Sequence, residues 1–278
     1  MTQKTRTILI PHDGSALSSR SAEILAPLLP AGTQVTLLHV DDGQPVDERA
    51  MTAAEKTLCS NGATVTRRTI ASKDPAGVIL DVAAELRPSL VAMSTHGRGG
   101  IERITRGSVA ERVLRGCPVS VLMTNPFTGD GSSTIESVLV PLDGSHNSTE
   151  VLDSVIPFAK AFSARVVLLY VDWIDPTDTP TGAAKRRAMR QADIEGWLAE
   201  PRERVAAADI EVSIEIAHGN VADELIRLAQ PEAYGLLAMT THGRTGPGRW
   251  LLGSTAEAVL RHCRLPLLLH RIGSAAFE

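Results

Sequence analysis

One stretch of 26 residues occurs twice in the chain, and this internal duplication restricts the fold to architectures built from two like units. It reads AMSTHGRGGIERITRGSVAERVLRGC at residues 92–117 and AMTTHGRTGPGRWLLGSTAEAVLRHC at residues 238–263, with 16 of the 26 positions identical at a constant offset of 146. The length of 278 residues independently favours two domains of ordinary size. We therefore expect one domain at residues 1–127 and a second at residues 133–278.

Apolar runs alternate with helical patterns in both halves. The runs expected to form strands are residues 7–10, 35–40, 63–71, 90–93 and 119–123, followed by residues 137–140, 165–171, 210–217, 236–239 and 265–269. Strand–helix alternation of this kind predicts a parallel, doubly wound sheet with right-handed crossovers. The third run of each half alternates apolar and polar residues, which indicates an edge strand.

The two halves differ in length. Equivalent positions are offset by 131 at Val40 and Val171 but by 146 at the duplicated stretch, so about 15 extra residues lie between the second and fourth strands of the second half. We expect a longer helix there, at residues 183–208, whose charged side chains form a solvated face. Residues 124–133 are polar and contain glycine and proline, which predicts a linker between the halves.

The composition argues against several classes of partner. Aromatic residues make up 3% of the chain, too few for the stacking platforms that bind single-stranded nucleic acid. A net charge of −4 gives no electrostatic attraction to nucleic acid or to an anionic membrane. The sequence has neither a signal-peptide core nor an apolar run long enough to span a bilayer. We therefore expect a cytoplasmic protein that binds neither nucleic acid nor membrane.

The cysteines indicate packing rather than chemistry. The chain has three of them, without CxxC spacing, which argues against a disulfide framework and a zinc site. Cys117 and Cys263 occupy matching positions of the duplication, just before apolar strands. We expect both to be small buried hydrophobic residues.

The duplicated stretch contains a glycine pattern that suits phosphate. Gly97 is followed by nine residues and then by Gly107-Ser108, and the second copy repeats this spacing at Gly243 and Gly253-Ser254. Each Gly-Ser pair opens a helical pattern. Free N–H groups and the helix dipole at such a helix start favour an anion. The plain alternative, that Ser108 is simply a helix N-cap, stays open.

Other strand ends add to this anion site. In an open α/β sheet the ligand lies at the carboxyl ends of the strands, at the topological switch point. There the chain places Asp13, Val40 and residues 94–97, which together resemble a mononucleotide pocket with an apolar wall and a carboxylate. Arg98 or Arg103 would add charge-assisted contacts. A turn-forming role for Asp13 and for its counterpart in the second half stays open.

Known phosphate motifs fit poorly. A Walker A loop needs lysine before its serine or threonine, and neither Ser108 nor Ser254 has one. A dinucleotide fingerprint would follow the first strand, where the sequence has Asp-Gly-Ser instead.

Three motifs together resemble the universal stress protein family. They are Pro-x-Asp-Gly-Ser after the first strand, Leu-Leu-His-Val at residues 37–40, and Thr-His-Gly-Arg-x-Gly followed by Gly-Ser. The resemblance covers roughly residues 5–124 and 135–271, as in a tandem universal stress protein. It implies two Rossmann-like domains of the adenine nucleotide α-hydrolase-like type, each a five-stranded parallel open sheet with helices on both faces and strand order 3-2-1-4-5.

The resemblance also implies a ligand, ATP or another adenine nucleotide, with or without Mg²⁺. The implied contacts of the first half are Pro11, His12, Asp13, Val40, Ser94, His96, Gly97, Arg98, Gly107, Ser108 and Val109. Those of the second half are Pro141, Leu142, Asp143, Val171, Thr240, His242, Gly243, Arg244, Gly253, Ser254 and Thr255.

The chain departs from the family's nucleotide-binding pattern at its first glycine, which is replaced by Ser94 in one copy and Thr240 in the other. A side chain there intrudes on close backbone approach to the ligand, and threonine is also β-branched and stiffer. We expect binding weakened by about 1–2 kcal/mol per site, with the first half slightly favoured.

Catalysis and metal binding have little support in the sequence. His96 and His242 have no second ligand at helical spacing, so we expect no metal site. Asp41-Asp42 and Asp172 are candidates for Mg²⁺ beside a nucleotide, although exposed loop acids are the commoner explanation. A base near a γ-phosphate and an electrophilic lysine are missing from the motif, so we expect no catalytic residue.

Three hypotheses for function stay open: a nucleotide-dependent stress sensor, which we favour, a ligand-free interaction module, and a weak ATPase. One hypothesis about assembly accompanies them. The last strand of each half is short and apolar, and an unpaired edge is a liability. We expect residues 119–123 and 265–269 to pair within the chain as a pseudo-dimer, and a further homodimer is compatible with this.

Overall fold

The computed structural model describes residues 7–29, 32–95, 109–128, 135–173, 180–241 and 253–273, the side chains of residues 28 and 180–190 excepted. Across these ranges, no helix combines the length and the apolar character needed to cross a membrane.

Helices and strands alternate in both repeats, as expected. The first repeat contains β1 (Thr7–Pro11), α1 (Ala16–Leu25), the 3-10 turn η1 (Ala26–Leu28), β2 (Gln34–Asp41), α2 (Glu48–Ser60), β3 (Thr64–Ala71), α3 (Pro75–Leu86), β4 (Leu90–Ser94), α4 (Val109–Gly116) and β5 (Val121–Thr124). The second contains β6 (Ser137–Pro141), α5 (His146–Thr149), α6 (Leu152–Phe162), β7 (Arg165–Asp172), α7 (Pro180–Ala206), β8 (Val212–His218), α8 (Val221–Leu228), β9 (Leu236–Thr240), α9 (Ser254–His262) and β10 (Leu267–His270). The strands β5 and β10 each begin two residues later than expected. In β10 the reason is Pro266, which has no N–H to donate to a sheet ladder.

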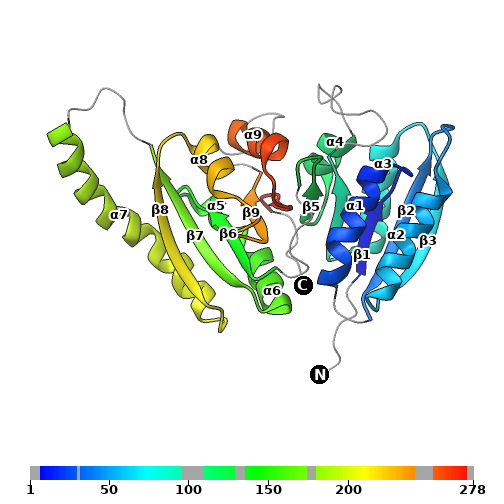
Figure 1. Cartoon of the computed structure of the whole chain (residues 1–278), viewed down its shortest axis with the longest axis horizontal. Helices are drawn as coiled ribbons and strands as arrows, with labels where there is room; N and C mark the ends of the chain where they lie inside the picture. Colours follow the sequence, from blue (N-terminus) through cyan, green and yellow to red (C-terminus); the bar gives the residue numbers. More distant parts are fainter. Residues whose placement is uncertain are drawn as a thin grey trace.

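All strands belong to one sheet with the order β3-β2-β1-β4-β5-β10-β9-β6-β7-β8 (Figure 1). Within each repeat the strands run parallel in the expected order 3-2-1-4-5. The repeats join where β5 and β10 pair antiparallel, with Leu268 opposite Leu122. This pairing confirms the expectation that the two last strands meet within the chain. The third strands, β3 and β8, form the outer edges, which is also as expected.

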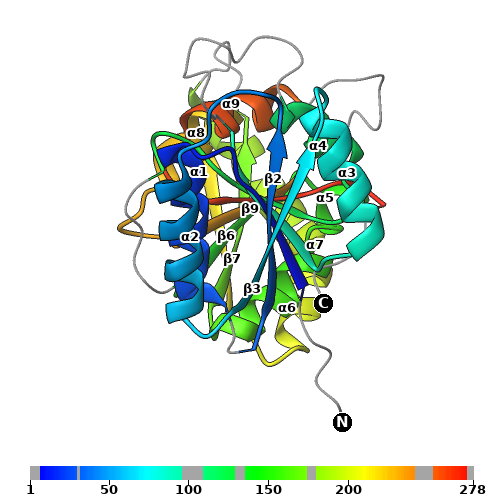
Figure 2. The same cartoon turned by 90° about the vertical axis from the view of Figure 1, so that its right-hand side faces the viewer.

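Helices cover both faces of the sheet. The helices α1 and α2 lie on one face of the first repeat, and α3 and α4 lie on the other (Figure 2). Successive strand residues serve opposite faces, so that Ile8 and Ile10 enter one core and Leu9 enters the other. Leu122 and Leu268 belong to the same core cluster. The hydrophobic core therefore continues from one repeat into the next across the β5–β10 joint.

The extra residues of the second repeat form a helix, as predicted. The helix α7 has 27 residues, whereas its counterpart α2 has 13. Its apolar side chains Ile194, Leu198 and Val205 are buried against the sheet.

The predicted linker starts later than residue 124, which corrects that expectation. Thr124 is the last residue of β5. Asn125 and Thr128 are each 2% exposed, because a turn at this point folds back onto the protein. Residues 129–134 lie outside the described residues.

Candidate functional site

The switch point of the first repeat lies between β1 and β4, which are neighbours in the sheet although two strands, β2 and β3, separate them along the chain. From β1 the chain passes outward to β2, and from β4 it passes the other way to β5. Pro11 and Ser94 end these two strands at the same edge of the sheet. The second repeat brings Pro141 and Thr240 together in the same way through β6 and β9. This is the position at which open α/β sheets bind ligands.

The Asp-Gly-Ser segment after β1 forms a tight turn. The Oδ1 atom of Asp13 accepts hydrogen bonds from the Ser15 N–H at 3.0 Å and the Ser18 hydroxyl at 2.7 Å. Gly14 adopts φ +82°, and a Cβ on it would approach Val46 Cγ2 at 2.6 Å, so this turn requires glycine. Asp13 therefore has the turn-forming role that the sequence left open.

The second repeat repeats this turn. The Ser145 N–H donates to Asp143 Oδ1 at 2.9 Å, and Gly144 adopts φ +80°. Asp13 and Asp143 are both half-buried at the switch point. Their contact with a ligand remains a prediction.

His12 is a core residue rather than a surface group. It is 3% exposed, and its Nδ1 accepts a hydrogen bond from the Gly14 N–H at 3.0 Å, while Nε2 lies 3.1 Å from the Ser19 hydroxyl. Burial lowers the pKa of His12 to about 4, although the Asp13 carboxylate acts in the opposite direction. The imidazole is therefore neutral and supports the turn. Its ligand contact also remains a prediction.

The predicted base wall lies at the ends of the second strands. Val40 is buried, and Val171, at the matching end of β7, is half-buried.

The two residues that replace the family's first glycine differ in exposure, and the larger of the two is the less exposed. Ser94 is half-buried, whereas Thr240 is 6% exposed at the end of β9. The larger side chain thus occupies the more closed position.

The glycine segments are anchored to the last strands. The Thr95 N–H donates to the carbonyl of Thr124 at 2.7 Å, and the Thr241 N–H donates to the carbonyl of His270 at 2.9 Å. In the second repeat, the Gly253 N–H donates to the Thr241 carbonyl at 3.2 Å, so the end of β9 and the start of α9 are held next to each other. Sequence reasoning missed Thr95 and Thr241, although their matching positions were visible in the duplication.

Part of the predicted site falls outside the described residues. The residues concerned are His96, Gly97, Arg98, Arg103, Gly107 and Ser108 in the first repeat and His242, Gly243 and Arg244 in the second.

The start of α9 is the best-defined part of the predicted phosphate site. Gly253 is the N-cap, with φ −56° and no side-chain capping bond, and Ser254 is the first helical residue. Since Ser254 is not the cap, the N-cap alternative raised for Ser108 does not hold at its counterpart. Among the residues that the structure describes, a Cβ on Gly253 would meet only the Thr241 carbonyl oxygen at 3.5 Å, an ordinary contact. The packing of the described part of the chain therefore does not require glycine at this position.

The acidic residues near the second strands have structural explanations in the first repeat. Asp41 and Asp42 accept hydrogen bonds from the N–H groups of Gly43 at 2.9 Å and Gln44 at 3.0 Å, in a turn of their own. Asp172 differs from the expected exposed acid, because it is 7% exposed, with His218 Nδ1 3.7 Å from its carboxylate. Among the described residues, no group of three His, Cys, Asp or Glu side chains could hold a metal ion.

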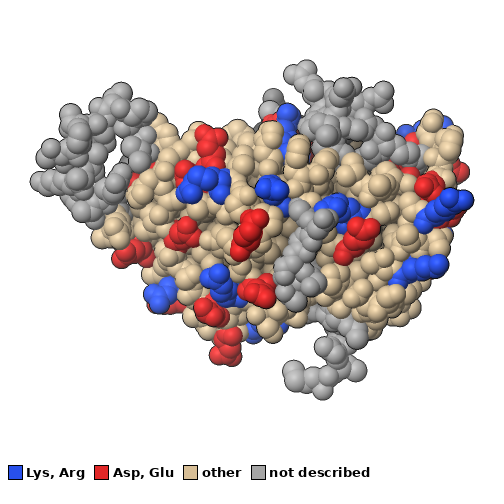
Figure 3. All heavy atoms as spheres, viewed as in Figure 1, with Lys and Arg blue, Asp and Glu red and all other residues tan. Residues whose placement is uncertain are grey.

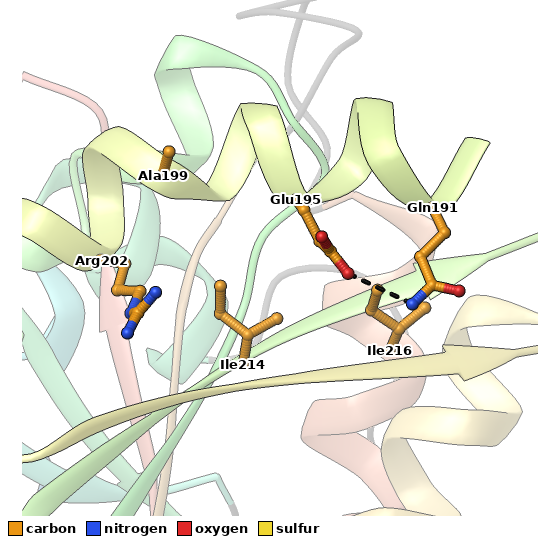
Figure 4. Close-up of a pocket in the computed structure, with 6 residues that line it drawn as sticks. All are labelled: Gln191, Glu195, Ala199, Arg202, Ile214 and Ile216. Atoms are coloured by element: carbon orange, nitrogen blue, oxygen red, sulfur yellow. Dashed lines mark hydrogen bonds between the residues drawn. The ribbon is translucent and has the colours of Figure 1, made fainter. Parts of the chain in front are cut away.

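A separate groove of about 400 Å³ lies between α7 and β8 (Figure 4). It is lined by Gln191, Glu195, Ala199, Arg202, Ile214 and Ile216. Gln191 Nε2 donates to Glu195 Oε1 across one helical turn at 3.2 Å. None of the predicted nucleotide contacts lines this groove, which belongs to the insertion that distinguishes the second repeat.

The model of the Universal stress protein family matches residues 4–125 and 134–271. The chain belongs to this family. It is thus a tandem universal stress protein, with two family domains in one chain.

Curated relatives and solved structures agree with this assignment. A universal stress protein of Methanocaldococcus jannaschii is 29% identical over 148 residues, covering 52% of this chain and 87% of the relative. One from Mycobacterium tuberculosis is 26% identical over 239 residues, covering 83% of this chain and 77% of the relative. The crystal structure of a universal stress protein from Archaeoglobus fulgidus superposes with a TM-score of 0.64 at 22% identity, covering 96% of each chain. That last likeness supports the tandem fold.

Proposed function

We propose that this tandem universal stress protein is a nucleotide-binding regulatory protein of the stress response. It holds ATP or another adenine nucleotide, with or without Mg²⁺, at the carboxyl ends of the strands, with the phosphates against the N-terminal ends of α4 and α9. The residues proposed for this role are those that the family resemblance implies.

Gly253 carries the proposal. Its backbone conformation is open to any residue, and the described residues around it would accept a Cβ, yet glycine stands at this position in both copies of the duplication. Close approach of a ligand to the helix start accounts for a glycine that the fold does not need. The exposed position of Ser254 beside it leaves a hydroxyl group available to the same ligand.

The charge distribution supports a local rather than a global attraction for the anion. Lysine and arginine are interspersed with aspartate and glutamate over the face shown in Figure 3, without a broad basic patch. Such a surface suits a small anion bound by backbone N–H groups better than a polyanion such as nucleic acid.

The first test is nucleotide release from freshly purified protein, by denaturation, anion-exchange chromatography and mass detection. We expect an adenine nucleotide at about one equivalent or more per chain, with the first repeat filled before the second. Absence of nucleotide, followed by no thermal shift with millimolar Mg-ATP, would leave the ligand-free interaction module as the better description.

A matched pair of variants tests the role of Gly253. Gly253→Ala adds a Cβ that the protein accommodates, so its free energy of unfolding should change by less than about 1 kcal/mol, the loss of a favourable N-cap residue. Its ATP affinity in the second repeat should fall markedly. Gly14→Ala, where the Cβ clashes with Val46, should instead lower stability. Equal ATP affinity of wild type and Gly253→Ala would remove the main support for the proposal.

The weak ATPase hypothesis needs its own measurement. Steady-state phosphate release that disappears in Gly107→Val would support it, whereas unchanged background hydrolysis would reject it.

A further inference from the structure

Asn125 and Arg271 form a reciprocal pair of contacts between the repeats. Their positions are equivalent at the offset of 146, as are those of Cys117 and Cys263. Asn125 Nδ2 donates to the carbonyl of Cys263 at 2.8 Å, and Arg271 Nε donates to the carbonyl of Cys117 at 3.1 Å. Each repeat therefore supplies a donor to the end of the other repeat's glycine-motif helix.

These donors satisfy groups that a helix leaves unpaired. The last carbonyls of an α-helix have no intrahelical partner. Asn125 Nδ2 also donates to the carbonyl of Leu260 at 3.1 Å, so one amide group serves two carbonyls at the end of α9. The Arg271 cation at the end of α4 is additionally favoured by the helix dipole. Both α4 and α9 lie beside the joint between the repeats (Figure 1).

Each donor is one residue away from the anchor of its own glycine segment. Thr124 accepts the hydrogen bond from Thr95, and Asn125 follows it; His270 accepts the bond from Thr241, and Arg271 follows it. A continuous path therefore runs from the start of one repeat's glycine segment to the C-terminal end of the other repeat's helix. The path exists in both directions.

We propose that Asn125 and Arg271 couple the two repeats, because they link the Thr95 or Thr241 anchor beside the ligand site of one repeat to the end of the glycine-motif helix of the other. Resting on the proposed function, this makes nucleotide binding positively cooperative. A ligand at the end of β4 that holds Thr95 against Thr124 strengthens the Asn125 cap on α9, so the second site loses less conformational entropy on binding. By thermodynamic linkage, ligand binding at the second site raises the ligand affinity of the first site by the same factor.

The second repeat depends on its cap more than the first does. The helix α4 is also held from its own repeat, because Arg112 Nη2 donates to Asp74 Oδ2, at the start of α3, at 3.0 Å. The residues equivalent to this pair are Ala258 and Asn220, which cannot form an ion pair. We therefore expect loss of Asn125 to have a larger effect than loss of Arg271.

One substitution removes the cap while keeping the turn that holds it. Asn125 Oδ1 accepts hydrogen bonds from the N–H groups of Phe127 at 2.8 Å and Thr128 at 2.9 Å. Asn125→Asp retains this acceptor but replaces the donor with an oxygen. Arg271→Met, which has a side chain of similar reach and no N–H donor, is its counterpart in the other repeat. Glu257→Gln, which breaks the Glu257–Arg261 pair on the surface of α9, is the control for weakening that helix without touching the cap.

The first experiment measures the rate of thiol labelling and needs no nucleotide. Cys117 and Cys263 are fully buried at the two helix ends, and burial raises the pKa of each thiol to about 11. In a Cys59→Ser background, maleimide labelling read by peptide mass should accelerate roughly tenfold at Cys263 in Asn125→Asp and by a smaller factor, roughly threefold, at Cys117 in Arg271→Met. Glu257→Gln should leave both rates nearly unchanged. Acceleration at both cysteines in each variant, or at neither, would overturn the coupling.

The second experiment measures ATP affinity by calorimetry, with Gly107→Val used to close the first site and Gly253→Val to close the second. Asn125→Asp should weaken the second site roughly tenfold and the first site much less, and Arg271→Met should show the reverse preference with a smaller effect. The same site weakened by both variants would overturn the proposal. If wild type binds no ATP while the crossed labelling pattern is present, the proposed function fails and the coupling of the repeats stands.

Discussion

His12 and Leu142 occupy equivalent positions after β1 and β6, and the fold buries both, at 3% and 4% exposure. One repeat thus places an ionisable ring where the other places an aliphatic side chain. The ring makes hydrogen bonds to Gly14 and Ser19, which ties the turn after β1 to α1. The second repeat forms its turn without this support.

This pair predicts a pH dependence that one substitution removes. The pKa of His12 lies at about 4 in the folded protein and near 6.5 in the unfolded chain. Because the folded value is the lower one, the stabilisation is complete above pH 6.5 and is lost as the pH falls towards 4, by about 3 kcal/mol in total. This loss of stability is measured by urea unfolding of wild type and His12→Leu at several pH values between 7 and 4.

The expected result is a crossing of the two stabilities. At pH 7, His12→Leu should be less stable by about 1–3 kcal/mol, because the Gly14 N–H loses its acceptor and the Ser19 hydroxyl keeps only its bond to the Ser15 carbonyl. Towards pH 4 the difference should shrink or reverse, since leucine carries no proton. A constant difference across this range would show that His12 is not neutral in the fold.

A second prediction concerns the position of the family's first glycine. Thr240 is 6% exposed at the end of β9. On the proposed function, its side chain should obstruct backbone approach to the ligand. Thr240→Gly should tighten ATP binding in the second repeat about tenfold, at a cost in stability of roughly 0.5–1 kcal/mol for glycine in a strand. Thr240→Ala keeps a Cβ and should gain less. The measurement is calorimetry in the Gly107→Val background, and equal affinity of all three proteins would contradict the steric account.

Much of the fold could be predicted because it depends on local patterns and on the duplication. Buried strands appear as apolar runs, as at β4 and β9, and alternation marks the edge strands β3 and β8. The offset between repeats located the insertion that became α7. The duplication also implied that the last strand of each half would need another strand to pair with. The structure shows that β5 and β10 pair with each other.

The remainder depends on contacts between residues far apart in sequence. Asn125 looked like the start of a polar linker, because nothing near it in the chain indicates that its amide caps a helix 138 residues later. His270 is similar: its Nδ1 lies 3.1 Å from the hydroxyls of both Ser120 and Ser154, one from each repeat. Such contacts between buried polar groups can be identified only once the pairing of β5 with β10 is known.

That joint gives the last prediction. Leu122 and Leu268 face each other across it and are each almost fully buried. Either leucine replaced by alanine should cost about 2–4 kcal/mol in the free energy of unfolding. Because the two side chains are direct cross-strand neighbours, the double variant should depart from additivity by about 0.5–1 kcal/mol. Leu122→Ala combined with Leu139→Ala is the control. Leu139 lies on β6, three strand spacings or roughly 14 Å away, so the effects of these two substitutions should be additive.

The measurement is urea unfolding followed by circular dichroism. Wild type should show one transition, because both cores run through the joint. Additivity of the Leu122 and Leu268 substitutions, or two separate transitions in wild type, would mean that the repeats fold independently despite sharing one sheet.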